Sequence, residues 1–287
     1  KPLTMPVQST SARHAHVGAP RSIDSAGEAL ALLELALLPV VWPLLLEAPR
    51  GDGHPVLLLP GFLGDEKSLV ALKLFLAGKG YQVESWGLGR NVGFQRKYIL
   101  ALNQKIRHMH FKSGRKVSLV GWSLGGVFAL VGALNAPECV RSIVTLGSPL
   151  SQDPAGSKTS HMVKSLYRLV AHPMGPSAHA MQPRAQALRR GELPQMPISC
   201  LYSLGDGVVP PQEATIDGNP ALHENIRVLG SHIGLGFNSM VLATVADRLA
   251  QAEDRWQPFN PRGLLKTACW MASYGEISRN PPHAAVE

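Results

Sequence analysis

Short apolar runs alternate with longer segments of mixed polarity through the middle of this 287-residue chain. One run, Val56–Leu59, is apolar at every position, and the others mix apolar residues with a few polar ones, which is typical of strands buried in a sheet. Helices are expected after two of them, one starting at Gly126 and one over Asn238 to Ala250. This alternation predicts an α/β fold with a mostly parallel central sheet flanked by helices. The predicted strands are Val56–Leu59, Tyr81–Trp86, Lys116–Val120, Ile198–Tyr202 and Ile226–Leu229.

The same pattern divides the chain into three parts. Residues 1–51 form a polar leader followed by an apolar helix, residues 52–257 form the α/β domain, and residues 258–287 form a tail. With 45% hydrophobic residues, the chain can bury one sizeable core. In the tail, several prolines predict irregular chain with one short apolar piece at 263–272.

Residues 151–197 interrupt the strand pattern and are expected to form a small helical lid. A stretch in this insertion places apolar side chains on one helical face. Such a face is expected to cover a site, exclude water and line an apolar pocket. A plain surface excursion is the alternative. The apolar side chains of this face are Met162, Val163, Leu166, Leu169 and Val170.

The apolar stretch from Ala29 to Leu46 allows more than one interpretation. Glu34, Pro39 and Pro43 interrupt it, and a membrane span needs about 20 consecutive apolar residues. We expect a helix packed across the core. Contact with a lipid surface or a partner is the alternative, and a membrane span or a retained signal sequence is favoured least. Three scattered cysteines favour a reducing compartment. The expected location is therefore cytoplasmic, with possible peripheral contact to a membrane.

A serine flanked by glycines provides the first sign of chemistry. Gly121-Trp-Ser-Leu-Gly125 stands between a predicted strand and a predicted helix, which is the context of a nucleophile elbow. Glycines on either side of Ser123 let strand and helix approach closely at this turn. The amino end of the helix also favours negative charge next to the serine. Ser123 is therefore the candidate nucleophile.

A serine nucleophile needs a general base, which an acid holds in position. Asp206 follows a predicted strand in a Gly-Asp-Gly loop, and His232 follows the last predicted strand in a glycine-rich loop. The order serine, aspartate, histidine is that of α/β-hydrolases. Asp206 is thus the predicted acid and His232 the predicted base, with Asp153 and Asp217 as reserve candidates for the acid.

An acyl-transfer site also needs two N–H donors for the oxyanion. One is expected from the residue after the nucleophile, Leu124, and the other from the loop after the first strand, where Phe62 stands in Pro60-Gly-Phe-Leu-Gly64. The residues expected to contact substrate are Phe62, Leu63, Trp122, Met162 and Leu166.

These motifs resemble those of the α/β-hydrolase superfamily, and within it the bacterial esterases and lipase-like proteins. Residues 60–64 are similar to their oxyanion loop, with proline in place of the usual histidine. The stretches 86–91 and 145–149 resemble a Leu-Gly-Arg-Asn segment and the strand end before the lid in some of these proteins. The resemblance covers about residues 52–257. It implies a hydrolase fold but not a substrate, because this fold supports many reactions.

Other functional classes fit the sequence less well. The net charge of +8 comes from scattered residues, and aromatic residues are only 6%, so no nucleic-acid partner is expected. No metal-ligand spacing is present, and neither a metal nor another cofactor is expected. The stretch from Gly87 to Gly93 mimics a dinucleotide fingerprint, but its spacing is GxGxxxG, and no acidic residue stands where the ribose ligand should fall.

The sequence therefore predicts a serine carboxylic ester hydrolase. It would act through an acyl-enzyme on hydrophobic acyl esters, with acylglycerols, other lipid esters or polyesters among the possible substrates. An acyltransferase or thioesterase with the same three residues is the alternative within this chemistry. A non-catalytic binding protein that shares the fold is the alternative from another class. The oligomeric state does not follow from the sequence.

Overall fold

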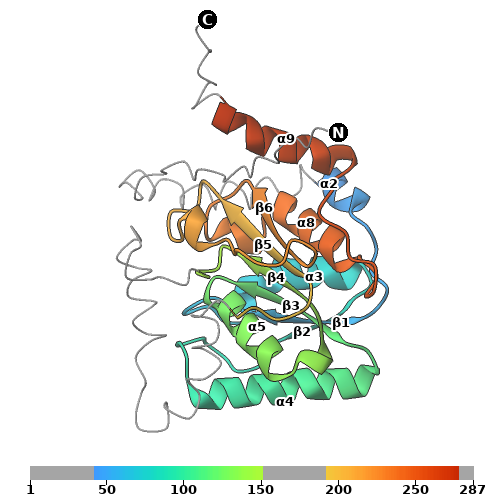
Figure 1. Cartoon of the computed structure of the whole chain (residues 1–287), viewed down its shortest axis with the longest axis vertical. Helices are drawn as coiled ribbons and strands as arrows, with labels where there is room; N and C mark the ends of the chain where they lie inside the picture. The colour runs from blue at the N-terminus through green and yellow to red at the C-terminus, as the bar shows by residue number, and fades with distance from the viewer. Residues whose placement is uncertain (1–41, 151–191, 278–287) are drawn as a thin grey trace, which may run out of the picture.

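A six-stranded, fully parallel sheet forms the centre of the molecule (Figure 1). The structure is a computed structural model that describes residues 42–150 and 192–277. The strand order β2-β1-β3-β4-β5-β6 places β3, which precedes Ser123, in the interior of the sheet. The predicted fold class is confirmed. The strands are β1 (Pro55–Leu59), β2 (Gln82–Ser85), β3 (Val117–Trp122), β4 (Val140–Leu146), β5 (Ile198–Ser203) and β6 (His223–Val228).

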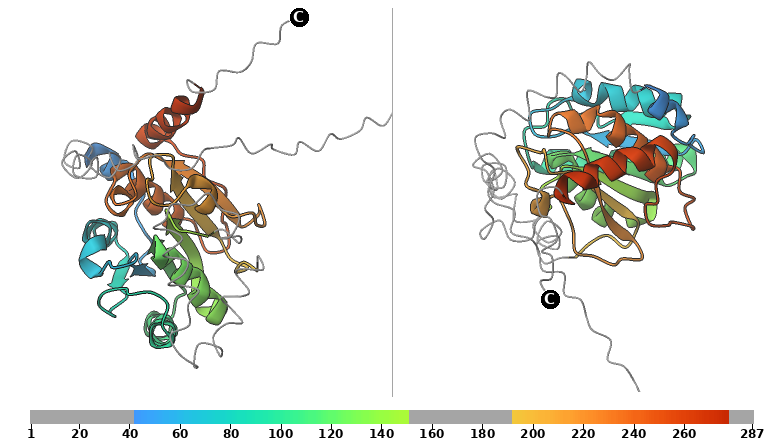
Figure 2. Two further views of the ribbon diagram at one scale, coloured as in Figure 1. Left: turned by 90° about the vertical axis from the view of Figure 1, so that its left-hand side faces the viewer. Right: turned by 90° about the horizontal axis from the view of Figure 1, so that it is seen from above.

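Helices cover both faces of this sheet (Figures 1 and 2). One face carries α2 (Trp42–Glu47), α3 (Val70–Gly78), α8 (Ser239–Leu249) and α9 (Gly263–Ile277). The other face carries α4 (Arg96–Ser113) and α5 (Leu124–Asn135). Short 3-10 turns join some of these elements: η1 (Glu66–Leu69), η2 (Pro137–Cys139), η4 (Pro211–Glu213) and η5 (Gly234–Gly236).

The consecutive apolar positions of the strands are explained by these two helical layers. In β1, Val56 and Leu58 pack into the cluster under α3 and α8, whereas Leu57 and Leu59 pack into the cluster under α4 and α5. All four side chains are buried. Because successive side chains of a strand point to opposite faces, both sets must be apolar.

The C-terminal region differs from the irregular tail that the sequence predicts. Gly263–Ile277 forms the helix α9, and its residue Leu265 is buried in the core cluster beneath α8. The N–H of Leu264 at its amino end donates to the Glu47 carboxylate of α2 at 3.2 Å. This cap comes from a residue 217 positions away, so local sequence does not show it. The piece predicted at 263–272 is thus part of a helix that belongs to the domain.

Only the end of the predicted N-terminal helix lies among the described residues, as α2. Leu45 of α2 is buried in the core, and Leu46 is exposed. The remainder of the predicted helix and the polar leader lie outside the described residues. Within residues 42–150 and 192–277, no helix combines the length and the apolar character needed to cross a bilayer.

A buried polar network joins the amino ends of β1, β3 and β4. His54 lies between Asp52, at 2.6 Å from its Nδ1, and the Ser118 hydroxyl, at 2.8 Å from its Nε2. Both His54 and Ser118 are fully buried. Arg141 binds the second oxygen of Asp52 at 2.9 Å. The array resembles an acid, base and serine set, but solvent does not reach its histidine or its serine, so it is a structural network.

This network predicts a loss of stability in acid. Burial lowers the pKa of His54 to about 4, with a further contribution from the charge of Arg141. An unfolded histidine has a pKa of about 6.5. Between pH 6.5 and about pH 4, this histidine is therefore protonated in the unfolded chain and neutral in the folded chain. The free energy of unfolding should therefore fall as the pH drops from about 6.5 to about 4, by roughly 3 kcal/mol in total. Urea unfolding at several pH values measures this free energy of unfolding.

The control for this prediction is His54→Gln, which removes the titrating group. Burial also lowers the pKa of His223. His223 therefore adds a loss of stability in acid that His54→Gln retains. A pH dependence in His54→Gln as steep as that of the wild type would contradict the assignment to His54.

Candidate active site

Ser123 occupies a strained turn between β3 and α5. Its backbone has φ 53° and ψ −123°, a conformation that side chains rarely adopt and that costs energy. A Cβ on Gly121 would lie 2.4 Å from the carbonyl carbon of Gly125, and one on Gly125 would lie 2.1 Å from the Leu59 carbonyl oxygen. Only glycine fits at both positions. The strand, the turn and the helix follow in the predicted order, with β3 ending at Trp122 and α5 beginning at Leu124 in place of the predicted Val120 and Gly126.

His232 lies between Ser123 and Asp206, within hydrogen-bond distance of both. Its Nε2 is 3.1 Å from the Ser123 hydroxyl oxygen, and its Nδ1 is 2.7 Å from Asp206 Oδ2. All three side chains are buried. An ionised carboxylate can only accept a hydrogen bond, so Nδ1 carries the proton and Nε2 is free to accept from the serine. The structure therefore brings the three predicted residues together in one hydrogen-bonded relay.

The Asp206 carboxylate is oriented by the backbone of its own loop. Its Oδ1 accepts the N–H groups of Val208 at 2.8 Å and Val209 at 2.7 Å. These bonds leave Oδ2 to face the imidazole. The reserve candidate Asp153 lies outside the described residues, and Asp217 lies in the chain before β6.

Trp122 supports the loop that carries His232. Its indole Nε1 donates to the His232 carbonyl oxygen at 3.0 Å, and the centroids of the two rings are 5.8 Å apart. From the sequence, Trp122 is expected only as a substrate contact, and this bond is not predicted. A contact that joins residues 110 positions apart has no signal in the local sequence.

Gly147, at the end of β4, makes room for the acid and the base. Its φ is +52°, and a Cβ at this position would lie 2.7 Å from Asp206 Oδ2 and 3.3 Å from His232 Nδ1. A side chain here would therefore push the carboxylate and the ring apart. From the sequence, this glycine is expected only as part of a strand end.

The loop predicted to form the oxyanion site passes directly beside the serine. A Cβ on Gly61 would lie 3.1 Å from the Ser123 Cβ. Leu124 begins α5, where N–H groups have no partner within the helix. Among the described residues, the N–H groups of Phe62 and Leu124 donate no hydrogen bond. Both amides are thus available to a substrate oxygen, and their role as oxyanion donors stays a prediction.

The predicted substrate contacts are located only in part. Phe62 is half-buried against the cluster under α5, and Leu63 is 57% exposed. Met162 and Leu166 lie outside the described residues, as does most of the predicted lid. Contact of any of these residues with substrate stays a prediction.

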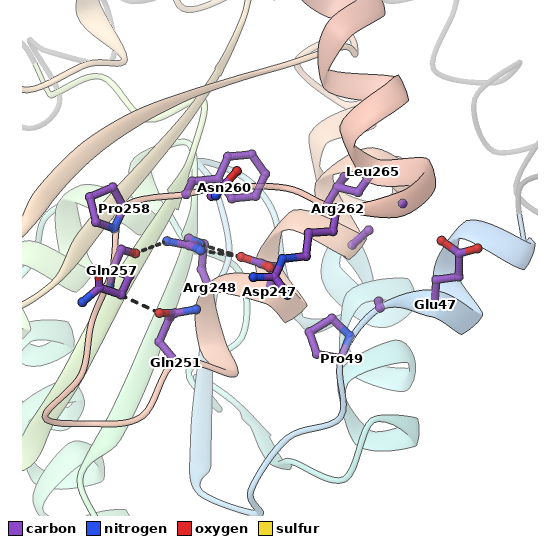
Figure 3. A pocket seen from close by; sticks show the side chains of 14 residues that line it. Glu47, Pro49, Asp247, Arg248, Gln251, Gln257, Pro258, Asn260, Arg262 and Leu265 are labelled. Carbon is purple, nitrogen blue, oxygen red and sulfur yellow. Dashed lines mark hydrogen bonds and ion pairs between the residues drawn. The ribbon is translucent and has the colours of Figure 1, made fainter.

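A cavity of about 980 Å³ lies apart from this site (Figure 3). The end of α8, the beginning of α9 and the chain before β1 line it. Arg248 inside it binds Asp247, Glu224 and the Gln257 carbonyl oxygen. None of the three relay residues lines this cavity, so it does not supply the substrate pocket. Within the described residues, no group of three or more potential ligands is arranged to hold a metal ion.

Comparison with known proteins gives partial matches. A family model described as "PGAP1-like alpha/beta domain" matches residues 81–179. "Serine hydrolase BPHL" of Mus musculus is 32% identical over 109 residues, covering 34% of this chain and 37% of that protein. "Pimeloyl-[acyl-carrier protein] methyl ester esterase" of Citrobacter koseri is 39% identical over 62 residues, covering 22% of this chain and 23% of that protein. The chain thus spans well under half the length of either curated relative.

Among solved structures, Aspergillus fumigatus lipase B aligns with a TM-score of 0.54 at 15% identity. The alignment covers 78% of this chain and 58% of the lipase. Together with the sheet order, this likeness shows that the chain has the α/β-hydrolase fold. The fold that the resemblance implies is confirmed, and both curated relatives carry the names of hydrolases.

Proposed function

We propose that the protein is a serine carboxylic ester hydrolase that acts through an acyl-enzyme. The observation that carries this proposal is the relay from Ser123 through His232 to Asp206, set on a strained elbow. Hydrolase names among the relatives support the reaction class. The ester bond as substrate is supported by the curated relative that is named a methyl ester esterase.

In the proposed acylation, His232 removes the proton of Ser123 while the serine oxygen attacks the acyl carbon. The oxygen of the former carbonyl becomes negative, and the Phe62 and Leu124 amides donate to it. Asp206 stabilises the imidazolium that forms. His232 then gives its proton to the leaving alcohol, and the acyl group remains on Ser123.

In the proposed deacylation, water takes the place of the alcohol. His232 removes a proton from the water as it attacks the acyl carbon, and the second tetrahedral intermediate uses the same two amides. Collapse of the intermediate returns the proton to Ser123 and releases the acid. The cycle needs no metal and no redox cofactor, because every proton transfer uses His232.

The proposed substrates are esters with a hydrophobic acyl group. Leu63 is exposed and Phe62 is half-buried in the loop whose Gly61 lies against Ser123, which supports an apolar contact for the acyl group. Medium-chain esters and acylglycerols are the first choices. A series of nitrophenyl esters of increasing acyl length tests this, and we expect an optimum above acetate. Equal or falling kcat/KM from acetate upward would contradict a hydrophobic acyl site.

An acyltransferase or a thioesterase would share the acyl-enzyme. An acyltransferase would pass the acyl group to an acceptor other than water, and a thioesterase would cleave a carbon–sulfur bond in place of a carbon–oxygen bond. Turnover in the presence of an added alcohol separates hydrolysis from transfer. The proposal predicts free acid as the main product, whereas a new ester as the main product would favour acyl transfer. To test for a thioesterase, kcat/KM is measured for a thioester and an oxygen ester that carry the same acyl group. A higher kcat/KM for the thioester would favour a thioesterase.

A further inference from the structure

The glycine-rich stretch after β2 contacts the predicted oxyanion loop. In the sequence it mimics a dinucleotide fingerprint, and the proposed reaction gives it no role. In the structure, Gly87, Gly89 and Gly93 all have positive φ, so the chain winds tightly there. The Trp86 indole closes the turn by donating to the Gly89 carbonyl oxygen at 2.8 Å. The turn delivers Asn91, which is fully buried, to residues 60–64.

Asn91 holds that loop through three hydrogen bonds. Its side-chain Nδ2 donates to the Pro60 carbonyl oxygen at 2.8 Å. Its backbone oxygen accepts from Leu63 N at 2.7 Å, and its backbone N–H donates to the Gly64 carbonyl oxygen at 2.8 Å. The bonds lie on both sides of Phe62, so they restrain the backbone that carries its amide.

The loop needs this support because its backbone is strained. Leu63 has φ 60°, a left-handed conformation that is costly for a residue with a side chain. The Asn91 oxygen binds the N–H of this same residue. On its own side, Asn91 is held in position by Gly93, whose N–H donates to Oδ1 at 3.1 Å.

We propose that Asn91 is a positioning residue that aims the Phe62 amide at the oxyanion. This inference rests on the proposed ester hydrolysis and adds to it the residue that preorganises one of its two donors. Asn91 does not touch the reacting atoms. Donors that are fixed before reaction stabilise developing charge without reorganisation, which is why the position of such a loop affects rate more than binding.

The test is Asn91→Asp, which keeps the size and the Oδ1 acceptor and removes the Nδ2 donor to Pro60. We expect kcat to fall by about 10²-fold, the low end of the effect of one lost oxyanion donor, with KM changed by less than about threefold. An aryl boronic acid, whose boronate oxygen takes the oxyanion position, should lose affinity in parallel. The pH profile of kcat should keep its shape, because the relay is intact.

Asn225→Ala is the matched control. Asn225 also clamps a loop through its side chain, with bonds to the N–H and the carbonyl oxygen of Ile216 at 3.0 and 2.9 Å, but it lies away from the elbow. We expect its loss to affect stability and not kcat. Asn91→Ala, measured in the same way, replaces Asn91→Asp if the latter does not fold.

The outcomes separate the two proposals. An active wild type with unchanged kcat and boronate affinity in a folded Asn91 variant would overturn the positioning role alone. The positioning role would also be overturned if the Asn91 variant and Asn225→Ala both lose rate, and if the fraction of folded protein accounts for the whole loss in each. A folded wild type without turnover on any ester would contradict the proposed function, and this inference with it.

Discussion

Replacing Ser123 with alanine is expected to lower ester turnover by at least about 10⁴-fold, because the relay then has no oxygen to deliver to the acyl carbon. The remaining rate would come from the oxyanion donors and from binding alone. Alanine removes only the hydroxyl, so the elbow and its two glycines stay in place. Initial rates of nitrophenyl ester hydrolysis, at equal concentrations of folded protein, measure the effect.

Ser118→Ala is the matched control for this experiment. Ser118 is also a buried serine whose hydroxyl binds a histidine that an aspartate holds. It lies near the amino end of β3, whereas Ser123 follows the carboxyl end. We expect the Ser118 variant to lose stability and keep its turnover per folded molecule. Retained turnover in Ser123→Ala, or its loss in Ser118→Ala alone, would contradict the assigned nucleophile.

Replacing Asp206 with asparagine should lower kcat by about 10³- to 10⁴-fold. The asparagine oxygen can still accept the N–H groups of Val208 and Val209, so the amide nitrogen would face His232 Nδ1. An N–H donor there favours the imidazole tautomer that carries its proton on Nε2. In that tautomer the ring cannot accept the proton of Ser123. The variant should therefore fold normally and fail as a catalyst, which kcat and thermal unfolding measure together.

The reserve candidate for the acid provides the comparison. Asp217→Asn removes a carboxylate from the chain before β6 and should leave kcat unchanged. A large loss of kcat in Asp217→Asn with normal turnover in Asp206→Asn would show that the aspartate bound to His232 is not the one that matters.

The fold could be predicted from the sequence because apolar runs mark the interior strands, although β2 and β6 also carry several polar residues. Val56 to Leu59 illustrates this: a strand covered by helices on both faces needs apolar side chains at every position. The helix α9 was missed for a different reason. The Glu47 carboxylate that caps its amino end comes from a residue 217 positions away, and the local prolines outweighed the short apolar piece at 263–272.

The relay residues could be predicted because each follows a strand and lies among glycines. Ser123, Asp206 and His232 follow the carboxyl ends of β3, β5 and β6, and parallel strands bring these ends to one edge of the sheet. The role of Gly147 could not be predicted, because it depends on atoms of two distant loops. The same holds for Asn91, because the Pro60 oxygen that its side chain binds lies 31 positions away. Its sequence signals are its place after a glycine-rich stretch and the Leu-Gly-Arg-Asn resemblance.

In the proposed reaction, Ser123 carries the acyl group during turnover. The most direct test is to treat the wild type with a fluorophosphonate, which reacts with activated serines, and to identify the modified peptide by mass spectrometry. We expect one phosphonyl group per chain, on Ser123, with parallel loss of ester hydrolysis and no labelling of Ser123→Ala. A folded protein that hydrolyses esters while Ser123 stays unmodified, or a phosphonyl group on another serine, would contradict it.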